Sequence, residues 1–464
     1  MDAFTKALQA SLGEKGFIPG SDAGEFTSDV TGKSATCLAV VRPTSTEEVS
    51  QVVKLCAQHG VAIVPQGGNT NVCGMTLAEA DRPTIILNLS RMNRVIDVDS
   101  ACSTITAESG CTIQTLQEAA AAKDRKFAPD WGARGTAQVG GAVATNGGGQ
   151  NVFRYGTTRE QVLGMQVVMP DGQIWDAMRT LRKDNSGYDI KQLMIGSEGT
   201  LGIITKLVFK LHPAQSVSNS MMAVLTDQRY LMDYLNLARE IAGDKLVAFE
   251  LLNGLGVEKA LERYPDLKRP FETRSDWYIL LRLAGSEPVD DTLGDVFEQG
   301  FEKQYLSDAI MAQSVDQERN LWEIREQMIP MQYFRNHLQC KWDVSVPLSN
   351  ITEFLTRAEA IAAKHSDDAI SYAVGHVGDG NIHYSIFLEN KPGIDLTRLE
   401  QIYLDEIDEL IWSYGGSIVA EHGVGTAYAD RMRKQKPEVE YAMMKNIKAL
   451  FDPLGIMNPG KLLE

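Results

Sequence analysis

The sequence lacks the patterns that mark several common classes of protein. Its six cysteines are spread along 464 residues without a CxxC pair, which disfavours an iron–sulfur cluster, a structural zinc module and a disulfide framework. It has no GxGxxG motif after a strand-like run and no GxxxxGK[ST] motif, so a Rossmann nicotinamide enzyme and a P-loop NTPase are both disfavoured. Any electrons that the protein handles must therefore use another carrier.

Positive charge and long apolar runs are also scarce. The formal net charge is −16 and the pI is about 5.0, so a phosphate backbone would be repelled and no nucleic-acid partner is expected. No window approaches the roughly 18 apolar residues of a membrane span, and the N-terminus MDAFTKALQASLGEKG has no apolar signal-peptide core. We expect a soluble, cytoplasmic protein without a membrane span.

What is present is the composition of a globular chain, 44% apolar and 23% charged, long enough for two or three domains. Residues 46–59 place valines at helical spacing and are followed by Gly60, which predicts a helix. The run VAIV predicts a buried strand, and the DG turn in GMQVVMPDGQIW predicts a hairpin. Glycine density falls near residue 213, where we expect a second domain of an α+β protein.

Two of the seven histidines flank a short turn in the stretch GHVGDGNIHYSIF. If Asp379 and Gly380 form a two-residue hairpin loop, His376 lies directly opposite His383. Cross-strand Cβ atoms are roughly 5 Å apart, so two imidazoles at these positions can share a metal ion. The alternative is a pair of hydrogen-bonded histidines with no ion between them.

A third ligand is available in the stretch GGSIVAEHGVG, where Glu421 and His422 end a strand-like run. Two histidines and a carboxylate form a three-ligand site with an open position, the arrangement used when a metal must bind substrate. A neutral His422 beside such a cation would be a good proton acceptor. The alternative for His422 is a role in supporting the site or the core.

Glycine-rich loops recur in order along the chain, and any one of them alone is ordinary loop punctuation. Together they resemble the FAD-binding domain of the vanillyl-alcohol oxidase type, and the later motifs resemble the C-terminal half of its D-2-hydroxy-acid dehydrogenase branch. The stretches that carry the resemblance are PQGGNT (65–70), PDWGARGTAQVGGAVATNGGGQNVFRYG (129–156), GSEGTLGIITK (196–206), GHVGDGNIH, AEHGVG and FDPLGIMNPGKLL (451–463).

The resemblance implies an α+β fold in which a two-part FAD-binding domain (1–212) precedes a substrate, or cap, domain with an antiparallel sheet (213–428), and a C-terminal segment (429–464) returns to the FAD domain. It implies noncovalent FAD, because the first glycine loop carries Asn69 where covalent attachment commonly uses a histidine. The implied FAD-binding residues are Pro65, Gln66, Gly67, Gly68, Asn69, Thr70, Gly74, Pro129, Gly135, Thr136, Gly140, Gly141, Ala144, Thr145, Asn146, Gly148, Gly149, Tyr155, Gly156, Glu198, Gly199, Gly202, Ile203, Ile204 and Asn458.

In the dehydrogenase branch, residues matching His376, His383 and Glu421 look like ligands of a divalent metal, zinc or manganese. The metal would lower the pKa of the substrate's α-hydroxyl as a Lewis acid. His422 would take the hydroxyl proton while a hydride passes to flavin N5.

Arg325 and Lys341 resemble the basic residues that 2-hydroxyglutarate dehydrogenases direct at the distal carboxylate, and Asn381 is a further implied substrate contact. The alternative is a surface ion pair, for instance with Glu323 or Asp343. Departures from the family pattern leave D-malate and D-lactate as rival substrates: Ser385 stands where the pattern has asparagine, and Ile329 stands where it has a hydroxyl residue.

The expected function is oxidation of D-2-hydroxyglutarate, or a related D-2-hydroxy dicarboxylate, by an enzyme whose electron acceptor is neither NAD nor oxygen. The acceptor would be an electron-transfer protein or a quinone-type compound. Alternatives are a D-lactate dehydrogenase, the flavin subunit of a glycolate-oxidase-like complex, or an oxidase. The oligomeric state stays open, with a homodimer as one option.

Overall fold

The computed structural model describes residues 2–79, 81–328, 333–391 and 395–463. Contacts divide the chain into two compact units: Met1–Gly149, Tyr155–Ala214 and Glu421–Glu464 form the first, and Gln150–Arg154 and Gln215–Ala420 form the second. Among the described residues, no helix combines the length and apolar content that crossing a membrane requires.

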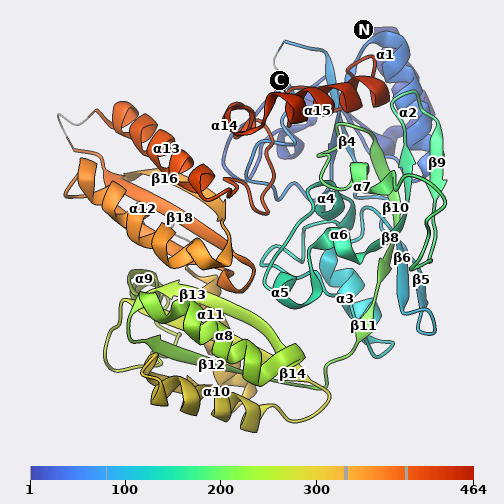
Figure 1. Ribbon diagram of the computed structural model, residues 1–464. Coiled ribbons are helices and arrows are strands. Elements are labelled where there is room, and N and C mark those ends of the chain that lie inside the picture. The colour runs from blue at the N-terminus through green and yellow to red at the C-terminus, as the bar shows by residue number, and fades with distance from the viewer. Residues whose placement is uncertain (1, 80, 329–332, 392–394, 464) are drawn as a thin grey trace. The chain divides into compact units, whose positions relative to one another are not determined.

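The first unit contains two larger sheets with helices packed on them (Figure 1). One sheet has the order β1-β2-β4-β3, with parallel pairing of β2 and β3 to β4, and the other is antiparallel with the order β5-β6-β10-β8-β9. The strands are β1 (Phe17–Pro19), β2 (Ala39–Val41), β3 (Ala62–Gln66), β4 (Thr84–Asn88), β5 (Val95–Asp99), β6 (Thr104–Glu108), β7 (Arg125–Lys126), β8 (Val162–Val168), β9 (Ile174–Ala177), β10 (Ile203–Lys210) and β11 (His212–Pro213). The helices are α1 (Asp2–Leu12), α2 (Thr46–His59), α3 (Ile113–Ala121), α4 (Val139–Ala144), α6 (Thr158–Gln161), α7 (Lys191–Met194), α14 (Ala429–Gln435) and α15 (Glu438–Phe451).

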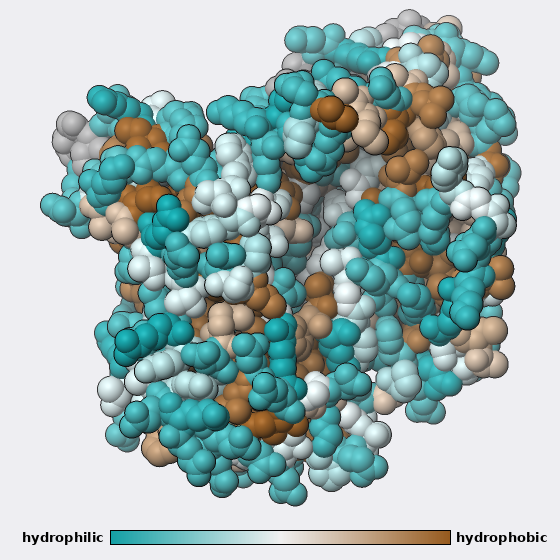
Figure 2. All heavy atoms as spheres, viewed as in Figure 1, coloured by the Kyte–Doolittle hydropathy of each residue, from teal (hydrophilic) through white to brown (hydrophobic). Residues whose placement is uncertain are grey.

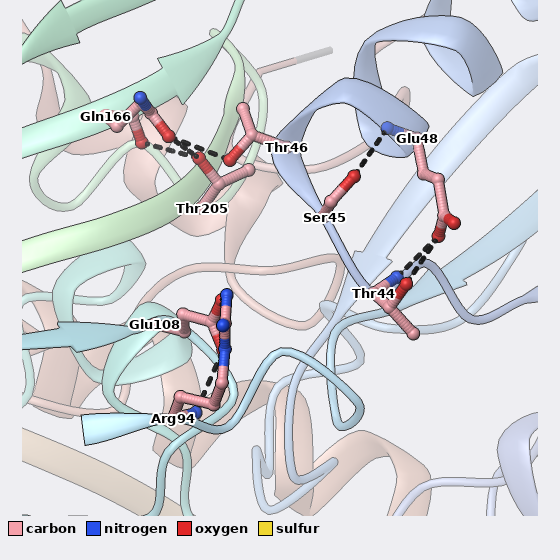
Figure 3. Close-up of polar contacts among 8 residues, drawn as sticks. All are labelled: Thr44, Ser45, Thr46, Glu48, Arg94, Glu108, Gln166 and Thr205. Atoms are coloured by element: carbon pink, nitrogen blue, oxygen red, sulfur yellow. Dashed lines mark hydrogen bonds and ion pairs between the residues drawn. The ribbon is translucent and has the colours of Figure 1, made fainter. Parts of the chain in front are cut away.

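Helix α2 has the bounds that its sequence predicts, and its capping residues explain why. The Ser45 hydroxyl accepts from the Glu48 N–H at 3.2 Å, and the Glu48 carboxylate accepts from the Thr44 N–H at 2.6 Å (Figure 3). These reciprocal bonds satisfy backbone donors at the start of the helix. Gly60 ends it in the left-handed conformation with φ of 67°, where glycine has no steric penalty.

Buried polar contacts tie α2 to the antiparallel sheet. The Thr46 hydroxyl donates to the Gln166 side chain of β8 at 2.7 Å, and the Thr205 hydroxyl of β10 donates to the Gln166 carbonyl at 3.2 Å (Figure 3). The predicted hairpin is confirmed here, because β8 and β9 pair antiparallel around a turn in which Gly172 has φ of 81°.

The end of the chain packs beside β3. The Ile63 N–H donates to the Ile456 carbonyl, and the Asn458 N–H donates to the Ile63 carbonyl, each at 2.8 Å. These bonds form a parallel bridge between Ile63 and Met457. Asn458 is thereby fixed beside β3, the strand that leads into the first glycine loop.

The second unit is a seven-stranded antiparallel sheet with the order β15-β12-β14-β13-β17-β18-β16 (Figure 1). This arrangement confirms the expected α+β class and the antiparallel sheet. The strands are β12 (Val217–Leu225), β13 (Leu246–Asn253), β14 (Trp277–Gly285), β15 (Leu306–Met311), β16 (His337–Ser345), β17 (Ile370–Gly375) and β18 (Asn381–Glu389). The helices are α8 (Leu231–Ala242), α9 (Gly254–Arg263), α10 (Asp290–Glu302), α11 (Val315–Glu326), α12 (Ile351–His365) and α13 (Leu396–Ser413).

Alternation along the strands separates the two faces of this sheet. One face carries residues such as Phe249, Trp342 and Ile382, which form a core with α8, α10, α12 and α13. The outer surface over α10 is mainly hydrophilic (Figure 2), as expected for a helix that buries one apolar stripe. On the other face, apolar residues pack beside α11. Polar side chains such as Asp343, Lys341 and Ser385 lie on this face of β16 and β18, and His383 pairs with Asp343 there.

Candidate cofactor cavity and histidine site

The first unit contains a cavity of about 310 Å³. Its walls come from the end of β3 and the following glycine loop, from α4, from the turn at residues 197–204, and from the C-terminal segment at Asn458. Loops and helix starts of this kind present many backbone N–H groups, which suits a ligand that carries phosphates.

Glycines in the wall leave room that the protein's own packing does not fill. A Cβ atom at Gly141, in α4, would meet no protein atom within 4 Å, so the absence of a side chain there keeps the cavity open. At Gly68 a Cβ atom would instead lie 1.9 Å from the Thr136 carbonyl oxygen, so only glycine lets these two loops approach each other. The cavity wall therefore needs both glycines, for different reasons.

Two buried side-chain oxygens at the cavity have no hydrogen-bond partner within the described part of the chain. These are Gln138 Oε1 and Asn458 Oδ1, and both residues line the cavity. Asn458 is held by its other end, because its Nδ2 donates to the carbonyls of Glu198 at 2.7 Å and Met75 at 3.2 Å. Buried acceptors without partners are costly, so a ligand with hydrogen-bond donors, such as a flavin, fits here.

Glu198 anchors the loop that follows His422. Its buried carboxylate accepts from the N–H groups of Val424 at 2.6 Å and Gly425 at 2.8 Å. Burial raises the pKa of Glu198 to about 7, although these two backbone donors and Lys461 act in the opposite direction. This contact fixes the loop of the AEHGVG stretch at the cavity wall.

Glu421 and His422 both line the cavity of the first unit. The Glu421 carboxylate accepts from the Gly149 N–H at 2.9 Å. His422 Nε2 lies 3.7 Å from Glu421 Oε1, and the His422 side chain is 39% exposed. A histidine that is open to the cavity can exchange a proton with a bound molecule, as a general base must.

Most residues implied by the family resemblance line this cavity, and some do not. Those that line it are Pro65, Gln66, Gly67, Gly68, Asn69, Thr70, Gly140, Gly141, Ala144, Thr145, Gly148, Gly149, Glu198, Gly199, Gly202, Ile203, Ile204 and Asn458. Those outside its lining are Gly74, Pro129, Gly135, Thr136, Asn146, Tyr155 and Gly156. The lining also includes Trp131 and Gln138, which we did not single out from the sequence, although both lie within the second glycine-rich stretch.

In the second unit the predicted register of the two histidines is wrong. Val374, not His376, pairs with His383, and the His376 carbonyl accepts from the Asn381 N–H at 3.2 Å. A 3₁₀ turn at Val377–Asp379 lengthens the loop, with Gly380 left-handed at φ of 92°. His383 is then a diagonal neighbour of His376 on the same face, and the two ring centroids are still 5.5 Å apart.

His376 is held by an acidic residue that the sequence analysis did not identify. Glu250 of β13 accepts at Oε1 from His376 Nδ1, 2.7 Å away, and at Oε2 from Arg325 Nε, 2.8 Å away. Burial alone would raise the pKa of Glu250, but His376 and Arg325 outweigh it and lower that pKa to about 2. A lone charged residue in the apolar strand LVAFELLN is the sequence signal that would have found it.

Asp343 of β16 is the register partner of His383, and its Oδ1 lies 3.5 Å from His383 Nδ1. Asp343 Oδ1 also accepts from Asn381 Nδ2 at 2.9 Å, and its Oδ2 accepts from the Ala420 N–H at 3.1 Å. Asn381 therefore uses its amide nitrogen inside the protein. Ala420 directly precedes Glu421, so Asp343 also fixes the backbone that leads to the third proposed ligand.

Lys341 shares a face of β16 with Asp343 and pairs in register with Ser385. It is half-buried and makes no ion pair within the described residues, so the pair with Asp343 considered from the sequence does not form. The alternative partner Glu323 is likewise not the residue that binds Arg325. Ser385 Oγ accepts from Gln339 Nε2 at 3.0 Å, and Ile329 lies outside the described residues.

The fold and the glycine-lined cavity indicate a flavin-binding protein, and comparison with known families leads to the same class. The model of the FAD binding domain family matches residues 37–177, and that of the FAD linked oxidases, C-terminal domain, matches residues 216–462. The chain belongs to the FAD-linked oxidases of the vanillyl-alcohol oxidase type. The solved structure of p-cresol methylhydroxylase with substrate bound shares the fold, with a TM-score of 0.78 at 17% identity over 99% of this chain and 96% of that one.

Two relatives place the chain more narrowly, in the D-2-hydroxy-acid dehydrogenase family. Mitochondrial D-2-hydroxyglutarate dehydrogenase of Danio rerio is 34% identical over 91% of this chain and 78% of its own length. A mitochondrial Schizosaccharomyces pombe protein, provisionally named a D-lactate dehydrogenase, is 35% identical over 91% of this chain and 81% of its own length. The chain is an FAD-dependent oxidoreductase of this family, and its relatives differ in the substrates that their names give.

Proposed function

We propose that this protein is an FAD- and divalent-metal-dependent dehydrogenase that oxidises a D-2-hydroxy dicarboxylate such as D-2-hydroxyglutarate to the 2-oxo acid. The observation that carries the proposal is the pair of neighbouring histidines, each with its Nδ1 towards a buried carboxylate. The same sheet face carries Lys341, which makes no ion pair with any residue that the structure describes. Metal-binding histidines are typically held in this way by an acidic partner.

The metal would be held by His376, His383 and Glu421 and would be zinc or manganese. When bound, the metal supplies a Lewis acid for the substrate hydroxyl, and the flavin supplies a hydride acceptor. His422 takes the hydroxyl proton. Pro65 to Thr70, α4 and Asn458 hold the noncovalent FAD.

The dicarboxylate preference is proposed on Lys341 and Arg325. Arg325 bonds to Glu250 through Nε, which leaves the terminal nitrogens of its guanidinium for a carboxylate. Lys341 would add a point charge. D-lactate is the second candidate, because Ser385 stands where the dicarboxylate pattern has asparagine, and its hydroxyl already accepts from Gln339.

The test is anaerobic bleaching of the bound flavin by a panel of D- and L-2-hydroxy acids. We expect bleaching by D-2-hydroxyglutarate and not by its L-enantiomer, with weaker bleaching by D-lactate. No bleaching by any 2-hydroxy acid would favour a subunit that functions only within an electron-transfer complex, and peroxide formation under air would favour an oxidase.

Lys341→Ala, assayed on the same panel, tests substrate choice. Loss of the lysine should lower kcat/KM for dicarboxylates roughly 10- to 100-fold, since a charge-assisted contact contributes about 1.5–3 kcal/mol, and should change D-lactate oxidation little. Lys364→Ala is the control, because Lys364 lies on α12 and pairs with Glu406. Equal losses on both substrates would contradict the proposed contact with the distal carboxylate.

A further inference from the structure

Glu250 is a buried charge in an otherwise apolar strand. It is 1% exposed, and its neighbours along β13 are apolar core residues. Removing a carboxylate from water costs several kcal/mol, and a buried ion pair often gives no more stability than apolar residues of similar volume. Folding alone therefore gives little reason for a carboxylate at this position.

Its two oxygens are used by two different side chains. Oε1 is 2.7 Å from His376 Nδ1, and Oε2 is 2.8 Å from Arg325 Nε. An ionised carboxylate only accepts hydrogen bonds, so the His376 ring must carry its proton on Nδ1. In the neutral ring, Nε2 of His376 is then the nitrogen that carries the lone pair, which is the atom a metal binds.

We propose that Glu250 is a positioning residue that holds His376 with Nε2 ready to bind the metal and, through its second oxygen, fixes Arg325 for the substrate carboxylate. This inference rests on the proposed function. Glu250 would thus couple the orientation of a metal ligand to that of a substrate-binding side chain, since movement of the carboxylate affects both.

Asp343 does not have the same role towards His383. Its contact with Nδ1 is longer, at 3.5 Å, and its oxygens already accept from Asn381 and from the Ala420 N–H. Asp343 therefore fixes the backbone at Ala420 and the start of β18 at Asn381, in addition to lying beside the His383 ring. Within the part of the chain that the structure describes, the Glu250 side chain bonds only to His376 and Arg325, so a substitution there changes fewer contacts than one at Asp343.

The experiment is Glu250→Gln in the flavin-loaded protein. Glutamine has one oxygen for two donors, so either His376 or Arg325 meets its NH₂ group instead of an acceptor. We expect zinc or manganese affinity, measured by chelator competition and elemental analysis, to fall roughly 10- to 100-fold. With metal restored to saturation, KM for the 2-hydroxy acid should still rise, while FAD content stays that of the wild type.

The matched control is Glu258→Gln. Glu258 on α9 is another buried glutamate that bridges two arginines, Arg269 and Arg274. Glutamine there should leave metal affinity unchanged. The double variant Glu250→Gln with His376→Ala tests whether Glu250 acts on the metal through His376. If it does, Glu250→Gln should cause no further loss of metal affinity in protein that already carries His376→Ala.

The outcomes separate this inference from the proposed function. Wild-type protein that binds no divalent metal would overturn the proposed metal site and this inference together. Metal binding by the wild type with equal affinity in Glu250→Gln would overturn this inference alone. If the variant does not fold, nitrogen NMR of histidine-labelled wild-type protein decides: a proton on His376 Nδ1 supports the inference, and a proton on Nε2 alone overturns it.

Discussion

At the scale of single residues, two buried glutamates do opposite things. Burial dominates at Glu198 and raises its pKa to about 7, whereas His376 and Arg325 lower the pKa of Glu250 to about 2. The difference arises because Glu198 meets mainly backbone N–H groups, while Glu250 meets an arginine and a histidine. The environment of each carboxyl, and not its residue type, therefore decides the direction in which its pKa shifts.

The raised pKa of Glu198 predicts a pH dependence of stability. A carboxyl whose pKa is higher in the folded state contributes stability that is fully present below its unfolded pKa near 4.5 and is lost as pH rises through about 7. Glu198→Gln should remove this loss. As the pH rises from 5 to 8, the melting temperature of the wild type should therefore fall relative to that of Glu198→Gln. The corresponding loss in the free energy of unfolding of the wild type is at most roughly 3 kcal/mol.

Thermal unfolding at several pH values measures this difference. Glu118→Gln, at an exposed position on α3, controls for the loss of one negative charge. A constant difference between wild type and Glu198→Gln across this range would contradict the assignment of a raised pKa to Glu198.

At the scale of elements, α4 shows how a short helix can form the wall of a ligand cavity. Gly141 lies inside the helix, and a Cβ atom there would meet no protein atom. A side chain at this position is compatible with the empty protein but would enter space that a cofactor needs.

Gly141→Val should therefore weaken FAD binding while leaving the flavin-free protein folded. Overpacking costs about 1–3 kcal/mol, so FAD affinity should fall roughly tenfold or more. Fluorescence titration of apoprotein with FAD measures the change. Gly294→Val is the matched control, because Gly294 also lies in a helix, α10, with no atom near its Cβ position, and FAD binding that is equal in the two variants would contradict the prediction.

Elements also differ in how well their sequences specify them. The helix at residues 46–59 has its bounds set by local signals, a capping serine and a terminal glycine, and the structure reproduces them. The loop at Asp379 and Gly380 has a strong hairpin signal, yet a 3₁₀ turn shifts the pairing so that Val374 faces His383. Hydrogen bonds between Asp379 N–H and the His376 carbonyl, and within the turn, favour the longer loop.

At the scale of the whole molecule, the proposed cofactor and metal residues are divided between the units. The cavity lining, including Glu421 and His422, belongs to the first unit, and His376 and His383 belong to the second. FAD retention should then not depend on the metal. A chelator should abolish turnover, zinc or manganese should restore it, and the flavin should remain with the protein during gel filtration.

Unchanged turnover in protein shown to be free of metal would refute the metal requirement. Loss of flavin together with the metal would show instead that the two sites depend on each other. Absorbance of the protein fraction at flavin wavelengths, measured beside its metal content, distinguishes these results.

The sequence by itself determined the class of the protein. Ordered glycine loops, closely spaced histidines and capping residues are local patterns, and they can be recognised from neighbouring residues without knowledge of the fold. It also determined that His376 and His383 would be neighbours, since a short loop joins them. Only the tertiary structure decided their register and brought Glu250 from β13 against both His376 and Arg325 of α11. It also placed Lys341 where no charged partner meets it among the residues that the structure describes. These contacts join residues far apart in the chain, and no local pattern encodes which buried carboxylate will meet which ring.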